Sequence, residues 1–266
     1  MGAALKIVFD VAVFRLRRLE MANMAAALAI MSALHLPGVE VAGRMVFALL
    51  LNLFVYLNND WLDLEQDLAS EDKNRDKTRF MADHPGAALG AQFGLLGILT
   101  VFALWWGGGL WLPLLLGGGV CWAYSKWLKR MPMVDVLAMI AWGVAMPMVG
   151  VPWGDPAGLA LLGQLGLFSG VFESIQVLRD RDEDEERGVQ TTAVVLGAAR
   201  THRMARGLMF ASGIYAALAF HPLLAAFPVA AAFVKLGDDV HVYWNKIRLI
   251  LGLCMLAETL LVWWWG

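Results

Sequence analysis

Long apolar segments, separated by short polar or Pro- and Gly-containing stretches, dominate the hydrophobic pattern of this chain. A helix that crosses a membrane needs about 20 mostly apolar residues, and on that template the chain holds about nine candidates. The pattern therefore predicts an all-α polytopic membrane protein whose residues 1–266 form a single bundle. The predicted spans are Leu19 to Leu36, Val39 to Asn58, Gly86 to Trp106, Leu110 to Tyr124, Met133 to Val151, Gly158 to Leu178, Met204 to Phe220, Leu223 to Leu236 and Ile247 to Trp265.

Composition supports a membrane protein and excludes several other classes. Hydrophobic residues make up 59% of the chain and charged residues 17%, whereas soluble domains are nearer half apolar and a quarter charged. A net charge of −2 gives no field that would attract nucleic acid. Cys121 and Cys254 lie in apolar segments without a partner at metal-ligand spacing, so we interpret both as small core residues.

The N-terminal stretch reads as a helix on the membrane surface. In Ala3 to Glu20, Asp10 interrupts the apolar run, and the arginines follow the run instead of preceding it. A cleaved signal peptide has the opposite order, with basic residues first. We therefore expect a short amphipathic helix that lies at the interface.

The basic residues predict how the spans are oriented. With nine spans, all but Arg44 of the 21 Lys and Arg residues fall on one side of the membrane. Basic residues collect in cytoplasmic loops, so the pattern places the N-terminus in the cytoplasm and the C-terminus outside, in an inner or plasma membrane.

Two acid-rich motifs follow the second and sixth spans, and both fall on the predicted cytoplasmic side. Asn59, Asp63 and Asp67 are four residues apart, with Asp60 beside them, so on a continuing helix all four line one face. Asp180 and Asp184 repeat that spacing. Carboxylate and amide oxygens suit Mg²⁺, which proteins usually share with the phosphates of a substrate. We predict that the two motifs face each other and bind Mg²⁺ through Asn59, Asp60, Asp63, Asp67, Asp180 and Asp184.

Two polar residues extend the second motif into the sixth span. Gln176 lies four residues before Asp180, and Glu173 lies deeper within the apolar segment. A carboxylate inside a span costs about 2.5–3.5 kcal/mol on insertion scales, so we expect Glu173 to face a polar cavity that is the active site. Asp180 to Arg187 taken alone is also the kind of charge run found in solvated loops.

These motifs resemble the UbiA superfamily of intramembrane prenyltransferases. The resemblance rests on Asn59-Asp60-x-x-Asp63-x-x-x-Asp67 and on Asp180-x-x-x-Asp184-x-x-x-Gly188-x-x-Thr191, and it covers most of the chain. It implies nine transmembrane helices with the two motifs on the second and sixth, and Mg²⁺ as the cofactor. It also implies catalytic roles for Asp63, Asp180 and Lys129, and a substrate site formed by Arg18, Asn59, Tyr124, Ser125, Lys129, Arg130, Glu173 and Gln176.

The chain departs from the family between the first motif and the third span. Many relatives carry a short Pro-x-Arg-Pro segment there that binds the phosphates of the substrate. Here the stretch Leu68 to His84 is longer and lacks that segment, and it supplies Lys73, Arg75, Lys77 and Arg79 instead. Its role is left open by the sequence.

The reaction that the resemblance implies is transfer of a polyprenyl group from an allylic polyprenyl diphosphate to a lipophilic acceptor. The acceptor would be an aromatic or quinone precursor, a pigment or a glycerol-phosphate lipid, and the carbocation would need a cavity that opens sideways to membrane lipid and excludes water. Two alternatives stay open: a membrane terpene cyclase that acts on the diphosphate alone, and a divalent-cation transporter. The sequence leaves the acceptor, the prenyl length and the oligomeric state open.

Overall fold

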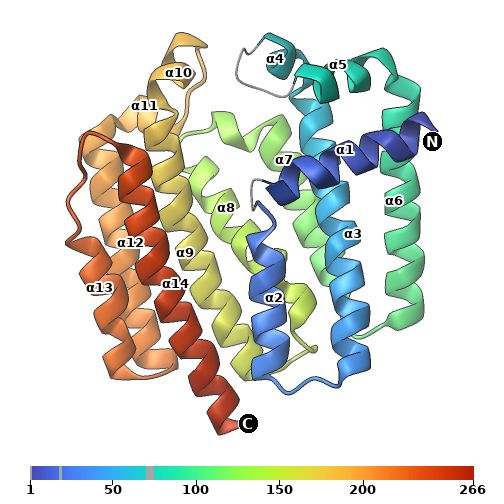
Figure 1. The fold of residues 1–266 in the computed structure, drawn as a ribbon. Helices are drawn as coiled ribbons and strands as arrows, with labels where there is room; N and C mark the ends of the chain where they lie inside the picture. The colour runs from blue at the N-terminus through green and yellow to red at the C-terminus, as the bar shows by residue number, and fades with distance from the viewer. Residues whose placement is uncertain (1, 18–19, 70–74) are drawn as a thin grey trace.

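A computed structural model describes residues 2–17, 20–69 and 75–266 of the chain. All regular elements in these ranges are helices, which confirms the all-α class (Figure 1). The α-helices are α1 (Ala3–Arg17), α2 (Ala22–Ala33), α3 (Gly38–Leu62), α4 (Leu64–Ala69), α5 (Arg75–Asp83), α6 (Pro85–Trp106), α7 (Gly118–Lys126), α8 (Val134–Ala145), α9 (Pro156–Arg179), α10 (Arg181–Glu186), α11 (Thr192–Leu196), α12 (Ala198–Ala219), α13 (Ala226–Ala232) and α14 (Val240–Trp265).

Four of these helices are long and apolar enough to cross a membrane: α3, α6, α9 and α14. The other predicted spans fall on helices that are shorter, broken or partly polar. Proline accounts for some of the breaks, because it lacks the N–H that continues a helix. A π-helical turn starts at Pro113 before α7, a 3-10 turn starts at Pro147 after α8, and another starts at Pro222 before α13. The count of nine crossings stays a prediction.

The N-terminal helix α1 lies across the bundle and does not run along it (Figure 1). Its Ile7 and Val11 are buried in a cluster with residues of α3, α5 and α6, while Leu5 and Phe9 are exposed. The structure thus has the amphipathic helix that the sequence predicts, and its place at a membrane surface stays a prediction.

The long helices pack in two groups, with α8 between them. One apolar cluster joins α3 and α6 to Met146 and Val149, which directly follow α8, and another joins α9, α12, α13 and α14. Small residues let α8 approach α9 closely: a Cβ added at Gly143 would lie 2.3 Å from the Ser169 Cβ, and one at Gly166 would lie 2.7 Å from a Val144 methyl. Close contact between helix backbones is how membrane helices gain dispersion energy.

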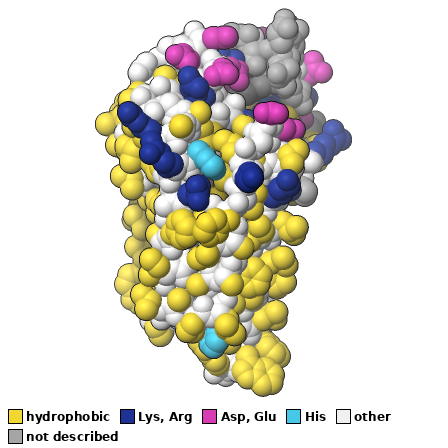
Figure 2. Space-filling view, turned by 90° about the vertical axis from the view of Figure 1, so that its left-hand side faces the viewer, with side chains coloured by type: hydrophobic (Ala, Val, Ile, Leu, Met, Phe, Trp, Pro, Cys, Tyr) yellow, Lys and Arg dark blue, Asp and Glu magenta, His cyan; other side chains and the backbone are white. Residues whose placement is uncertain are grey.

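Charged side chains gather at one end of the bundle. In Figure 2 the face formed by α12 to α14 is hydrophobic over its lower part, with Lys and Arg above it and acidic side chains above these. The exposed basic residues of this end include Arg200, Arg203, Lys235, Lys246 and Arg248.

Arg44, the basic residue that the charge pattern leaves over, lies near the opposite end. Its side chain is buried, and its guanidinium donates to the Val149 carbonyl at 2.9 Å and pairs with Glu40 at 2.9 Å. These partners satisfy the charge locally, so Arg44 is a structural tie between α3 and the turn after α8.

Candidate active site

The first acid motif lies where α3 ends. Asp63 caps α3, its N–H donating to the Asn59 carbonyl at 3.0 Å, and α4 begins at the next residue. The Asp67 N–H donates to the Asp63 carbonyl at 2.8 Å, so the four-residue hydrogen-bond spacing continues across the break. Asn59 and Asp63 are half-buried and Asp67 is buried. The sequence predicts one continuing helix here, whereas the structure has two helices with Asp63 at the joint.

The second acid motif is built in the same way at the end of α9. Asp180 caps α9, its N–H donating to the Gln176 carbonyl at 3.0 Å, and α10 follows. The Asp184 N–H donates to the Asp180 carbonyl at 2.9 Å. Both motifs lie at the same end of the bundle, where α4 and α10 project in Figure 1.

Residues 124–135, which run from the last turn of α7 to the first turn of α8, contact the first motif on one side and α9 on the other. The Ser125 hydroxyl donates to Asn59 Oδ1 at 2.8 Å, and the Lys129 ammonium pairs with Asp63. On the other side, the Tyr124 hydroxyl donates to Glu173 Oε1 of α9 at 2.6 Å. Five of the residues that the sequence assigns to the substrate site, Asn59, Tyr124, Ser125, Lys129 and Glu173, are therefore connected through this one segment.

The remaining predicted substrate residues differ in their placement. Glu173 is 3% exposed, and Gln176, one turn nearer the end of α9, is half-buried. Arg130 follows Lys129 in a 3-10 turn and is exposed. Arg18 lies outside the described residues.

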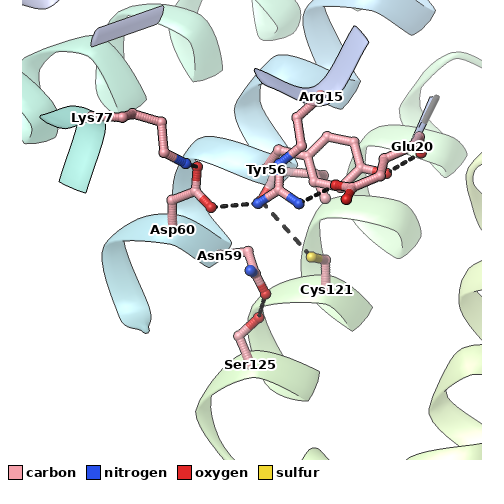
Figure 3. A network of polar contacts seen from close by, with 9 residues as sticks. Arg15, Glu20, Tyr56, Asn59, Asp60, Lys77, Cys121 and Ser125 are labelled. Carbon is pink, nitrogen blue, oxygen red and sulfur yellow. Dashed lines mark hydrogen bonds and ion pairs between the residues drawn. The ribbon is translucent and has the colours of Figure 1, made fainter. Parts of the chain in front are cut away.

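Asp60 is turned toward a different set of partners (Figure 3). Its Oδ2 accepts from the Lys77 ammonium of α5 at 2.5 Å, and its Oδ1 pairs with the Arg15 guanidinium of α1. Arg15 also pairs with Glu20 and lies over the Tyr56 ring at 4.5 Å. The sequence pattern groups Asp60 with the metal ligands, whereas in the structure both of its oxygens are engaged by cations that hold α1 and α5 against α3.

Basic side chains also hold the second motif. The Arg179 guanidinium forms a two-point contact with Asp180, at 2.6 and 2.8 Å. Burial, and to a lesser extent the nearby Asp180 carboxylate, raises the pKa of Asp184 to about 6. A raised carboxyl pKa means that the negative charge is held at a cost, which a bound cation would offset.

The donor set fits Mg²⁺ only if the ion is shared with a substrate. Within the described ranges, no three Asp, Glu, His or Cys side chains converge into a complete metal site. The oxygens instead form two separate groups, Asn59 with Asp63 and Asp67, and Asp180 with Asp184. Mg²⁺ commonly uses one or two carboxylates and completes its shell with waters and phosphate oxygens. Two incomplete carboxylate groups at one end of the bundle fit that pattern.

Sequence reasoning missed Asp135 in this region, and it did not predict which carboxylate Arg15 and Lys77 contact. Arg15 and Lys77 are the partners of Asp60, and Asp135, at the start of α8, is fully buried and bonded to Thr192 next to the second motif. The sequence could have indicated Asp135, because it is a charged residue at the start of a predicted apolar span. For Arg15 and Lys77 the sequence shows the charge of each residue but not its partner.

Known proteins share both the family pattern and the fold. Residues 21–264 match the UbiA prenyltransferase family. A digeranylgeranylglyceryl phosphate synthase superposes with a TM-score of 0.75 at 13% identity, over 98% of this chain and 99% of that one. A UbiA homolog from Archaeoglobus fulgidus bound to GPP and Mg²⁺ superposes with a TM-score of 0.69 at 15% identity, again over 98% and 99%. The same homolog bound to DMAPP and Mg²⁺ gives 0.68 at 15% identity, with the same coverage.

No curated protein matches the sequence. The family match, in contrast, spans nearly the whole chain, and the structural likeness extends over the full length of both partners. The chain therefore belongs to the UbiA prenyltransferase family.

Proposed function

We propose that this protein transfers a polyprenyl group from an allylic polyprenyl diphosphate to a lipophilic acceptor, with Mg²⁺ as cofactor. The observation that carries the proposal is the segment of residues 124–135, which bonds to the first acid motif through Ser125 and Lys129 and to the second half of the bundle through Tyr124. Solved structures of the same fold bind GPP or DMAPP together with Mg²⁺, which supports this class of donor.

Within this proposal, Asn59, Asp63 and Asp67 on one side and Asp180 and Asp184 on the other would hold Mg²⁺. When bound, the metal would neutralise charge on the diphosphate oxygens as the carbon–oxygen bond breaks. Asp60 has a different role, because Arg15 of α1 and Lys77 of α5 engage it and its side chain is 5% exposed, against 35% for Asp180; it holds the two helices that cover this end of α3.

The protein's own side chains supply the rest of the chemistry. Lys129, now paired with Asp63, lies where its ammonium can stabilise the pyrophosphate that leaves, with Arg130 next to it in the chain. Fixed charges of this kind lower the barrier because they are in place before the bond breaks. The Tyr124 hydroxyl holds Glu173 at 2.6 Å and so fixes a carboxylate beneath the second motif.

The membrane arrangement is part of the same proposal. Nine crossings would place the acid motifs and the N-terminus in the cytoplasm, because nearly all Lys and Arg lie at that end. A cavity that opens sideways to the bilayer would let the prenyl chain and the lipophilic acceptor enter from lipid and would keep water from the carbocation.

The test is turnover by the purified protein in detergent or in liposomes. Geranylgeranyl or farnesyl diphosphate is supplied with a panel of lipophilic acceptors, and pyrophosphate release is measured with Mg²⁺ and with EDTA. We expect release that requires both Mg²⁺ and an acceptor. Folded protein that releases no pyrophosphate from any donor would refute the proposal.

The same assay separates the alternatives. Pyrophosphate release with a cyclic product in the absence of any acceptor would identify a terpene cyclase. Uptake of divalent metal into proteoliposomes without diphosphate turnover would identify a transporter.

A further inference from the structure

Asp135 is a carboxylate with no exposure to solvent, at the start of α8. Its Oδ1 accepts from the Val136 N–H at 2.8 Å and from the Thr192 hydroxyl, and its Oδ2 accepts from the Thr192 N–H at 2.7 Å. Burying an ionised carboxylate is costly unless donors surround it, and hydrogen bonds to a charged acceptor are stronger than neutral ones. Two of these three donors, the N–H and the hydroxyl of Thr192, therefore bond the start of α8 to the start of α11.

Thr192 also accepts a hydrogen bond from the residue that precedes α8. The Met133 N–H donates to Thr192 Oγ1 at 2.6 Å, so Thr192 bonds to α8 as donor and as acceptor. Met133 has a φ of +68°, a conformation that non-glycine residues adopt at a cost and keep only where the surroundings enforce it. The contact to Thr192 is part of that enforcement, which makes this a rigid connection.

Thr192 is the far end of the segment that carries the second acid motif. Between them the chain folds tightly: the Val189 N–H donates to the Asp184 carbonyl at 2.8 Å, and the Thr191 N–H donates to the Val189 carbonyl at 3.1 Å. A shift of Thr192 is therefore passed to Asp184 through a short hydrogen-bonded turn.

Asp135 also belongs to the segment that holds the first motif. The residues that contact Asn59 and Asp63, namely Ser125 at the end of α7 and Lys129 after it, precede Asp135 in the segment of residues 124–135. This segment is thus bonded to the first motif at one end and, at the other, to Thr192, which follows the second motif.

We infer that Asp135 is a positioning residue: through Thr192 it fixes the second acid motif at the separation from the first that one diphosphate can bridge. The inference rests on the proposed function, because it assigns the two motifs to one shared ligand. A role limited to capping α11 would stabilise the fold without affecting how the two motifs bind that ligand.

Thr192→Val and Thr192→Ser form the matched pair that tests this. Valine keeps the shape of threonine and removes the hydroxyl that bonds to both Asp135 and Met133, whereas serine keeps the hydroxyl. Asp135→Asn is the second, harsher variant. Binding of inorganic pyrophosphate in the presence of Mg²⁺ is measured by calorimetry on folded protein, and hydrogen exchange is followed at residues 184–196.

We expect Thr192→Val to raise the Kd for Mg²⁺-pyrophosphate by about 10-fold or more, the usual effect of losing a residue that orients a ligand group. Thr192→Ser should bind like wild type. If Thr192→Val has faster hydrogen exchange but unchanged affinity for pyrophosphate, Asp135 only caps α11. That result would overturn the inference and leave the proposed function intact. A wild-type protein that does not bind Mg²⁺-pyrophosphate would overturn both.

Discussion

Asp60→Asn tests whether this aspartate is a structural counter-ion or a metal ligand. The Lys77 Nζ and the Asp60 Oδ2 are 2.5 Å apart, and the side chains of Asp60 and Lys77 are 5% and 7% exposed. At an effective dielectric constant of about 20, two unit charges at that distance attract by about 7 kcal/mol, most of which is offset by the cost of removing both ions from water. Asparagine keeps the size of the side chain and leaves Lys77 and Arg15 without this carboxylate. Removing one partner of a buried pair costs about 3–5 kcal/mol, so we expect a loss near 3 kcal/mol.

Asp10→Asn is the matched control. The Lys6–Asp10 pair on α1 has the same 2.5 Å separation, but its side chains are 41% and 25% exposed. Pairs of this kind contribute about 0–1 kcal/mol, so burial is the variable that differs between the two pairs. The free energy of unfolding is measured for both variants by SDS titration in mixed micelles. Lys77→Met in the Asp60→Asn background should cost less than it does alone, because the two residues form one pair.

Two results would refute this reasoning. If Asp60→Asn lowers the free energy of unfolding no more than Asp10→Asn does, the buried pair contributes nothing to stability. If Asp60→Asn kept its stability and instead raised the Mg²⁺ concentration needed for turnover by about 10-fold, a loss on the scale of a metal-site residue, Asp60 would be the metal ligand that the sequence pattern predicts.

Three further predictions concern the site and the packing beneath it. Tyr124→Phe removes the hydroxyl that holds Glu173 and should lower turnover by about 10-fold or more. Its control is Tyr215→Phe, which loses a hydroxyl bonded to the Ala160 carbonyl at 2.9 Å. The control should lower the free energy of unfolding by about 1 kcal/mol and leave turnover unchanged. Lys129→Met should lower kcat by about 100-fold, against little change in Lys126→Met, whose ammonium lies over two tryptophan rings. Gly143→Val should destabilise the α8–α9 contact by about 1–3 kcal/mol, measured by the same SDS titration; unchanged stability would show that the two helices can separate without cost.

The length of each apolar segment predicted which long helices are present. It predicted less well the residue at which each helix begins. Hydropathy marks the apolar part of a segment, so α14 is predicted to start at Ile247, whereas it begins at Val240, where Asp239 accepts from the first backbone N–H groups. The same reasoning places the start of α12 at Met204, but it begins at Ala198. Polar first turns belong to these helices because the helix continues beyond the apolar region.

The pairing of charges could not be predicted from spacing. The four-residue interval places Asn59, Asp63 and Asp67 correctly on consecutive turns, because local hydrogen bonding sets that geometry. Which way Asp60 turns depends on α1 and α5, whose Arg15 and Lys77 are 45 and 17 residues away in the chain. Contacts over such distances follow from how the helices dock, which periodicity does not specify.

The same need for counter-charge explains why so many acidic residues of this region have a basic partner. Asp60 is paired with Arg15 and Lys77, Asp63 with Lys129, and Asp180 with Arg179. Half-buried carboxylates without such partners would be costly in the absence of ligand. Under the proposed function, an Asp63 that binds metal would no longer need Lys129, and the ammonium would become available to the pyrophosphate. Asp60 would keep its cations when metal binds, because Arg15 and Lys77 hold the covering helices α1 and α5 and the Asp60 side chain is nearly fully buried. The basic residues that indicate orientation in the sequence therefore also pair with carboxylates of both acid motifs in the absence of ligand.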